Sequence, residues 1–225
     1  MKQKVYWNNV AYKKEFTTPF HFEAFEKVVG KDAFILDIGC GYGRTLQQLY
    51  KHGYSNLVGI DFSEKMIERG KNQYPYLDLR VKNKKEIEFE DNSCDAVILF
   101  AVLTCIIDDK EQLDLIKEIK RILKPNGVIY INDFLLNSDE RNLKRYKEFE
   151  NKYGKYGVFE LPEGAVVRHH SIKWIKELCD FFEYIALEQV TYTTMNGNKS
   201  NGFLFFRTKI SNELELSKLE LLEKV

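Results

Sequence analysis

Three glycines at alternate positions form the most informative motif of the chain, within the segment ILDIGCGYGRTL at residues 35–46. Glycine has no side chain to hold a ligand away from the main chain, and it adopts backbone angles that other residues avoid. An apolar strand pattern leads into the glycines and a helical pattern follows them. In doubly wound folds, such a loop lies at the carboxyl end of a parallel sheet and binds a nucleotide. The segment therefore predicts a nucleotide-binding loop at Gly39, Gly41 and Gly43.

The spacing of these glycines narrows the kind of nucleotide. A dinucleotide fingerprint reads G-x-G-x-x-G, so that a pyrophosphate can lie on the helix N-terminus. Here Arg44 stands where the third glycine would be, and Asp37 lies two residues before the loop. A carboxylate is a poor neighbour for a pyrophosphate and a good one for a cation. The pattern thus indicates S-adenosylmethionine, whose sulfonium and ammonium groups are positively charged.

From about residue 34 to residue 134, the chain resembles the class I S-adenosylmethionine-dependent methyltransferases. VGIDFS at residues 58–63 is similar to the second strand of the family, and IEFEDNSCDAVIL at 87–99 to the approach to the fourth. IKRILKPNG at 119–127 resembles the helix and turn before the fifth strand. The resemblance implies methyl transfer to an O or N atom of a small molecule, with S-adenosylhomocysteine as the product of the cofactor.

The resemblance also implies the residues that bind the cofactor. Asp61 ends the second strand, where the family holds the ribose hydroxyls, and a carboxylate can accept two hydrogen bonds from adjacent hydroxyls. Many members carry an acid for the adenine amino group, but this chain has Asn83, whose amide oxygen can accept the same bond, followed by Lys84 with its backbone NH. The predicted cofactor-binding residues are Tyr12, Asp37, Gly39, Cys40, Gly41, Arg44, Asp61, Phe62, Met66, Asn83, Lys84 and Phe100.

The acceptor side has fewer sequence signals. His169 and His170 are candidate general bases, and Arg168 is a candidate ligand for an acidic substrate. Thr104 and Asp133 follow predicted strands and are expected to border the acceptor. A base is not obligatory, because the thioether leaves without protonation and positioning is the main task. Structural roles for the histidines and for Arg168 therefore stay open.

The cofactor motifs also have plainer interpretations. The glycines can form a tight strand-to-helix turn, and Asp37 can brace that turn. Asp61 can act as the N-cap of the helix that begins near residue 63, since Asp is a preferred cap. Phe62 and Met66 are ordinary core residue types. The agreement of several motifs favours ligand binding.

The elements that must hold these residues alternate between strand and helix from residue 34 to residue 134, which predicts a doubly wound, Rossmann-like α/β fold. We expect a seven-stranded, mostly parallel sheet with a final antiparallel hairpin strand, because Asn-Gly pairs separate the last two strand patterns. The predicted parts are an N-terminal helical extension (1–30), the cofactor-binding domain (31–210) with an inserted lid (135–170), and a C-terminal amphipathic helix (211–225).

Composition limits the partners and the compartment. The 34 basic and 34 acidic side chains give a formal net charge of zero, which argues against nucleic acid as a partner. The basic run Arg141, Lys144, Arg145 and Lys147 lies among acids and is interpreted as solvated surface. The four cysteines lack C-x-x-C spacing, so we expect no metal site and a reducing compartment. No apolar run is long enough to span a bilayer, and a cytoplasmic protein is expected.

Other functions remain alternatives at this stage. An RNA-modifying methyltransferase is one, and a module that binds S-adenosylmethionine without catalysis is another. The absence of the third fingerprint glycine argues against a nicotinamide-dependent oxidoreductase. A homodimer is also open, because the leucines of residues 213–225 can pack on the domain or on a partner chain.

Overall fold

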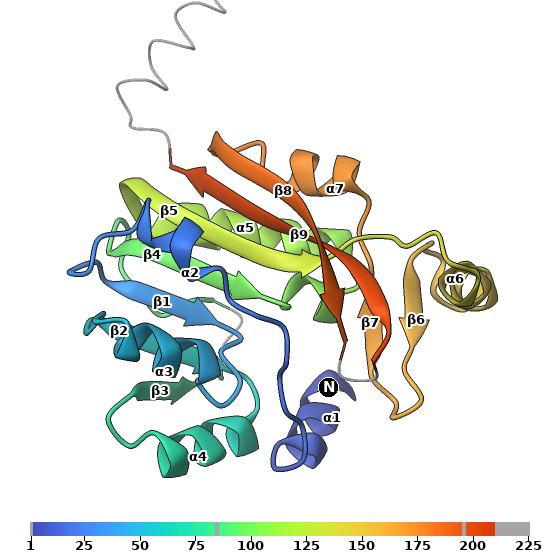
Figure 1. The fold of residues 1–225 in the computed structure, drawn as a ribbon, viewed down its shortest axis with the longest axis horizontal. Helices are drawn as coiled ribbons and strands as arrows, with labels where there is room; N and C mark the ends of the chain where they lie inside the picture. Colours follow the sequence, from blue (N-terminus) through green and yellow to red (C-terminus); the bar gives the residue numbers. More distant parts are fainter. Residues whose placement is uncertain (1, 84–85, 195–196, 210–225) are drawn as a thin grey trace, which may run out of the picture.

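The fold is centred on one sheet with strand order β3-β2-β1-β4-β5-β9-β8 (Figure 1). The structure, a computed structural model, describes residues 2–83, 86–194 and 197–209. The five strands from β3 to β5 are parallel, whereas β9 runs antiparallel to both β5 and β8. The predicted fold class is therefore confirmed. The strands are β1 (Ile35–Ile38), β2 (Leu57–Asp61), β3 (Asp78–Val81), β4 (Cys94–Phe100), β5 (Leu123–Phe134), β8 (Glu183–Thr193) and β9 (Lys199–Thr208).

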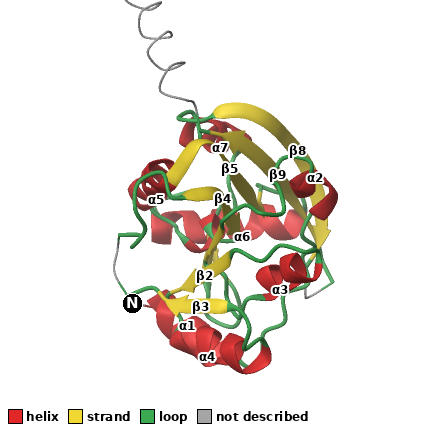
Figure 2. Cartoon of the chain, turned by 90° about the vertical axis from the view of Figure 1, so that its left-hand side faces the viewer, coloured by secondary structure: helices red, strands yellow, loops and turns green. Residues whose placement is uncertain are grey.

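Helices cover both faces of the sheet (Figure 2). One buried cluster joins the sheet to α5 and α7, and a second joins its other face to α2, α3 and α4. In α5, Ile116, Ile119 and Ile122 are buried at helical spacing, so one apolar stripe faces the sheet. The helices are α2 (Phe22–Glu26), α3 (Arg44–Lys51), α4 (Glu64–Gln73), α5 (Asp109–Ile122) and α7 (Ile172–Leu178).

Two further segments lie beyond the carboxyl ends of the parallel strands, one at the lower centre of Figure 1 and the other at its right. One is the N-terminal helix α1 (Lys2–Val10), and the other comprises α6 (Glu140–Tyr153) with the small hairpin β6 (Val158–Glu160) and β7 (Val166–Arg168). The Lys14 ammonium reaches the Glu163 carboxylate at 2.8 Å, which ties the two segments together. A short 3-10 turn, η1 (Leu103–Cys105), follows β4 beside them.

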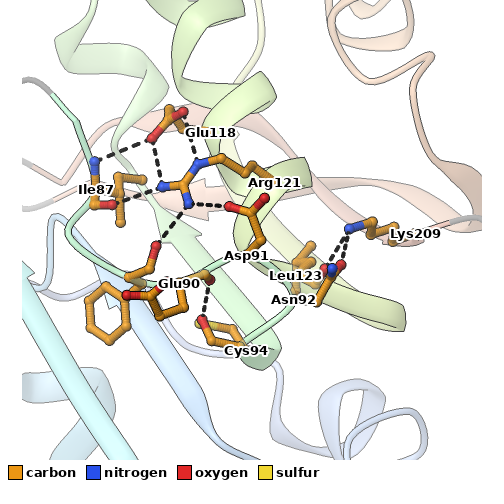
Figure 3. A network of polar contacts seen from close by, with 11 residues as sticks. Ile87, Glu90, Asp91, Asn92, Cys94, Glu118, Arg121, Leu123 and Lys209 are labelled. Atoms are coloured by element: carbon orange, nitrogen blue, oxygen red, sulfur yellow. Dashed lines mark hydrogen bonds and ion pairs between the residues drawn. The ribbon is translucent and has the colours of Figure 1, made fainter.

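A polar network at the opposite end of the sheet holds the segment between β3 and β4 on α5 (Figure 3). The Arg121 guanidinium donates to the carbonyl oxygens of Ile87 and Phe89, both at 2.9 Å. It also meets the carboxylates of Asp91 and Glu118, at 2.7 and 3.0 Å. One side chain thus satisfies two loop carbonyls and fixes the entry into β4.

Two predicted features lie outside the described residues, and Asp95 of the motif at 87–99 makes structural contacts. The expected C-terminal helix at 211–225 and Lys84 both lie outside the described residues. Asp95 accepts from the Phe34 amide and pairs with Lys124, so its role in the structure is to join strands. None of the helices in the described part of the chain combines the length and apolar character needed to cross a membrane.

Candidate active site

A cavity of about 270 Å³ is lined by residues at the carboxyl ends of β1, β2 and β4, by the N-terminal segment and by the α6–β7 insertion. Its walls come from parts of the chain that are far apart in sequence. Among the residues predicted for the site, those that line it are Asp37, Gly39, Cys40, Gly41, Arg44, Asp61, Phe62, Met66, Phe100, Thr104 and His169.

The glycine loop passes close to its neighbours, and two of its positions require glycine. Gly39 and Gly41 have φ values of 74° and 56°, in the left-handed region that side chains disfavour. A Cβ at Gly39 would lie 2.7 Å from the Val102 side chain, and one at Gly41 would lie 2.9 Å from Phe16. The loop therefore presents bare backbone to the cavity, as the alternating glycines predict.

Asp61 connects the glycine loop to the second strand. Its carboxylate accepts from the Gly41 amide at 2.9 Å and from the Ser63 amide at 2.8 Å, one bond to each oxygen. The helix cap is Ser63, whose hydroxyl accepts from the Met66 amide, so the alternative of Asp61 as N-cap is wrong. Each carboxylate oxygen retains acceptor capacity, which suits two adjacent hydroxyls. Burial raises the pKa of Asp61, while the two amide bonds lower it.

The Asp37 carboxyl lines the same end of the cavity as Asp61, and its ionised form would attract a cation. Burial raises the pKa of its carboxyl to about 8, and the nearby charge of Asp61 adds to this, whereas Arg44 opposes it. Among the described residues, no hydrogen-bond donor satisfies the Asp37 carboxylate. A positively charged ligand would stabilise its ionised form. The two carboxylates of this half of the cavity thus fit a nucleoside that carries a positive charge.

Other predicted cofactor residues divide into those at the cavity and those away from it. Phe62, Met66 and Phe100 supply apolar walls, and Phe100 also lies 5.4 Å from the Arg44 guanidinium. Tyr12 is 56% exposed and outside the lining, and Asn83 is exposed and outside it as well. The aromatic residues that the N-terminal segment does bring to the cavity are Tyr6, Trp7 and Phe16. Phe16 stacks on Tyr42 with a centroid distance of 5.3 Å.

His169 is the one predicted histidine that lines the cavity. Its Nδ1 accepts from the Tyr146 hydroxyl at 2.6 Å and lies 3.2 Å from the Asn137 side-chain amide. The Asn137 backbone amide donates to the same tyrosine oxygen, so the hydroxyl proton points at the histidine. Burial lowers the pKa of His169 well below its usual range. The ring is therefore neutral with its proton on Nε2, which makes it a hydrogen-bond donor toward the cavity.

His170 and Arg168 point away from the cavity, contrary to the expectation that they face substrate. His170 accepts at Nε2 from Gln112, at 2.8 Å, and its Nδ1 lies 3.2 Å from the Phe134 carbonyl. The Arg168 guanidinium pairs with Asp109 at 2.6 Å. Successive side chains of an extended segment point to opposite sides, so residues 165, 167 and 169 line the cavity and residues 168 and 170 do not.

Of the two residues expected to border the acceptor, Thr104 lines the cavity and Asp133 lies behind it. The Asp133 carboxylate is buried, accepts from the amides of Thr104 and Phe134, and does not line the cavity. Burial raises its pKa to about 7, against the lowering effect of those amides. Thr104 lines the cavity but donates its hydroxyl to the Arg168 carbonyl at 2.9 Å.

The interpretation of the basic run on α6 as solvated surface is wrong for Arg145, which is partly buried, whereas Arg141 is exposed and also reaches the cavity. Arg141 and Arg145 line the cavity, one helical turn apart, and Arg145 lies flat on Phe159 with its Cζ 3.5 Å from the ring centroid. Phe134 and Phe159, which also line the cavity, were not predicted for the site. The available signal was the i, i+4 spacing of the two arginines.

Comparisons with known proteins agree with this geometry. Residues 36–131 match the family model described as a methyltransferase domain. An S-adenosylmethionine-dependent methyltransferase of solved structure from Methanosarcina mazei is 27% identical, with a TM-score of 0.79 over 87% of this chain and 99% of that one. Residues 36–131 therefore form a methyltransferase domain, and the fold is similar to that of the S-adenosylmethionine-dependent methyltransferases. A demethylmenaquinone methyltransferase from Lysinibacillus sphaericus is 26% identical over 187 residues, which are 76% of this chain and 77% of the relative. A Pyrococcus horikoshii protein of solved structure, 23% identical with a TM-score of 0.67, shares the fold.

S-adenosylmethionine, the cofactor of the Methanosarcina mazei methyltransferase, supplies an electrophilic methyl group. We propose that the glycine loop, Asp61 and Asp37 hold this cofactor. In this role Asp61 binds the ribose hydroxyls and Asp37 faces the positive end. The walls formed by Phe62, Met66 and Phe100 exclude water from the cofactor.

Proposed function

We propose that the protein transfers a methyl group from S-adenosylmethionine to an O or N atom of a small molecule. The observation that carries the proposal is the continuity of the cavity. The same space is lined by Asp61 at the glycine loop and by Phe159 and His169 of the insertion. An acceptor held against the insertion therefore meets a cofactor held by the loop without crossing solvent.

The neighbouring side chains favour positioning over proton removal. Asp133 is buried behind the cavity floor, and His169 presents a proton rather than a lone pair. Positioning alone can provide much of the rate enhancement in a displacement whose leaving group needs no proton. An acceptor that is already nucleophilic, such as a neutral amine or an ionised hydroxyl, fits this arrangement.

A small-molecule acceptor is supported by the dimensions of the cavity and by the relatives. The demethylmenaquinone methyltransferases carry a small molecule in their names, and several of them cover about four fifths of this chain. The insertion roofs the cavity through the contact between Lys14 and Glu163 at 2.8 Å. The balanced charge of the chain gives no general attraction for RNA. We also expect the protein to act in a reducing compartment such as the cytoplasm, since its four cysteines are unpaired.

The test combines cofactor binding with a transfer assay. Calorimetric titration with S-adenosylmethionine and S-adenosylhomocysteine should show binding that Asp61→Asn weakens roughly ten- to hundredfold, because charged hydrogen bonds are lost. Asp78→Asn is the matched control, since Asp78 is exposed on the neighbouring strand and pairs with Arg80 outside the cavity. Radiolabelled methyl groups are then offered with a small-molecule extract, with total RNA and with a protein extract. Label in the small-molecule fraction supports the proposal, whereas label only in RNA or protein refutes it.

A further inference from the structure

The acceptor half of the cavity carries positive charge that the protein itself does not neutralise. Arg141 and Arg145 lie on the same face of α6, where like charges one turn apart repel each other. Within the described residues, the ion-pair partner of Arg141 is Asp139 at 3.7 Å, and that carboxylate also caps the helix. No carboxylate of the described residues lies within 4.0 Å of the Arg145 guanidinium. An anion between the two arginines would relieve this repulsion.

Arg145 is held in a fixed orientation that exposes few of its atoms. Its guanidinium stacks on Phe159 at 3.5 Å, and its Nε is buried without a hydrogen-bond partner. Burial lowers the pKa of Arg145, and the charge of Arg141 adds to this effect. A guanidinium fixed on an aromatic ring retains its planar fork of donors, which matches the geometry of a carboxylate or phosphate.

His169 adds a third donor at the same place. Its Nδ1 is occupied by the Tyr146 hydroxyl, so the neutral ring offers Nε2–H to the cavity. Arg145 and His169 both contact the Phe159 ring, at 3.5 and 4.9 Å from its centroid, so the Arg145 guanidinium and the imidazole lie around one aromatic side chain. A neutral donor beside two cations suits an oxyanion and not a cationic acceptor.

The remaining wall residues indicate the shape of the part of the acceptor that carries no charge. Phe134 stacks on the His169 ring at 5.7 Å, and the Phe159 ring meets the same imidazole edge-on at 4.9 Å. Ala165 and Val167 complete an apolar wall beside them. Flat apolar surfaces of this kind bind an aromatic or otherwise planar body.

We propose that the methyl acceptor is a small planar molecule that carries an oxyanion, bound by Arg141, Arg145 and the Nε2–H of His169. The inference rests on the proposed methyl transfer to a small molecule, and it names the class of that molecule. Carboxylate and phosphate share the required chemistry. In this arrangement Asp37 and Asp61, with Arg44 beside them, face the cationic cofactor, and the two arginines of α6 face the anionic acceptor.

The test measures binding of acceptor-like probes to the complex with S-adenosylhomocysteine, without requiring turnover. The probes are 4-hydroxybenzoate, phenyl phosphate and the uncharged 4-hydroxybenzamide, titrated by calorimetry. At least one charged probe should bind roughly tenfold or more tightly than the benzamide, as expected for hydrogen bonds to charged groups. Preference between the two charged probes distinguishes carboxylate from phosphate as the group recognised.

Arg145→Gln is expected to weaken the charged probe roughly tenfold or more and to leave the benzamide within about twofold. Lys147→Gln is the matched control, because it removes one positive charge from an exposed position on the same helix outside the cavity. Unchanged binding of S-adenosylhomocysteine in both variants shows that the fold is intact. Equal binding of charged and neutral probes, binding of no probe, or an equal loss in Lys147→Gln would overturn the inference.

This result separates the inference from the proposed function. Charge-dependent probe binding with no methyl transfer to any small molecule would support the oxyanion site and refute the proposed reaction. Transfer to neutral small molecules, with no charge-dependent probe binding, would support the proposed reaction and refute the oxyanion site.

Discussion

Binding of S-adenosylmethionine is expected to release a proton from Asp37. The carboxyl is 2% exposed, and its pKa is raised to about 8, mainly by burial and further by Asp61. In the free protein at neutral pH it is therefore mostly protonated. A positive ligand favours the ionised form, so binding lowers this pKa and affinity increases as the pH rises toward 8.

The size of the effect follows from this pKa. With a value of about 8, roughly 1% of the carboxyl groups are ionised at pH 6 and about half at pH 8. If the bound cofactor holds the pKa below 6, affinity rises about fiftyfold over this range, which is about 2.3 kcal/mol. A free-state pKa one unit lower still gives about a tenfold increase. Above pH 8 the affinity levels off, because the carboxyl is then ionised before the ligand binds.

Calorimetry measures both parts of this prediction. Titrations at pH 7 in buffers of different ionisation enthalpy should give a slope of about 0.9 proton released for each cofactor bound. Affinity is then measured from pH 6 to pH 8 on the native protein and on Asp37→Asn, which is isosteric and cannot ionise. The ligand titrates identically in both experiments, so its own contribution cancels. Absence of proton release, or the same pH dependence in Asp37→Asn, would refute the reasoning.

Three further substitutions test the loop, the acceptor wall and the scaffold. Gly41→Ala places a Cβ 2.9 Å from the Phe16 ring, at a backbone φ of 56°. We expect this variant to lose about 1–3 kcal/mol of stability and to bind the cofactor more weakly. The control is Gly30→Ala, whose Cβ meets nothing within 4 Å, and it should melt at the same temperature as the native protein. Tyr146→Phe removes the donor to His169 Nδ1 and should cost about 1–2 kcal/mol by denaturant unfolding, with cofactor affinity unchanged; a loss of cofactor affinity would contradict this assignment. Arg121→Ala removes the brace of two loop carbonyls and should lower stability by about 1–3 kcal/mol with S-adenosylhomocysteine still bound normally; an unaltered melting temperature would show that the network contributes little.

The cofactor half of the site could be predicted because its residues lie in local motifs on adjacent strands. Gly39 follows β1 and Asp61 ends β2, and the parallel pairing of these strands brings the two motifs together at one edge. A short sequence pattern therefore fixes both the identity of the residues and their neighbours. Tyr12 was predicted without such a strand-end position, whereas Asn83 was predicted because it follows β3; both lie outside the lining.

The acceptor half could not be predicted in the same way, because it depends on how the insertion packs. Helix α6 buries Asn142 and Tyr146 rather than a clear apolar stripe, so its sequence does not show which face turns inward. The two arginines on that helix look like solvated charges until the fold places them on Phe159. Neighbouring His169 and His170 posed the same difficulty, since an extended segment sends them to opposite sides and the sequence does not say which side holds the cavity.

The carboxylates of the cofactor half and the arginines of the acceptor half affect each other through the charges of the bound molecules. Transfer of the methyl group converts the sulfonium into a neutral thioether while the ammonium keeps its charge, so in the proposed binding mode Asp37 faces one positive charge fewer as the product forms. Protonation of Asp37 then restores the free state, because burial favours the neutral carboxyl. The same step weakens the electrostatic attraction between the cofactor and an acceptor held by Arg141 and Arg145. Product release is thus favoured by the groups that favour binding of the reactants, with no side chain required to move.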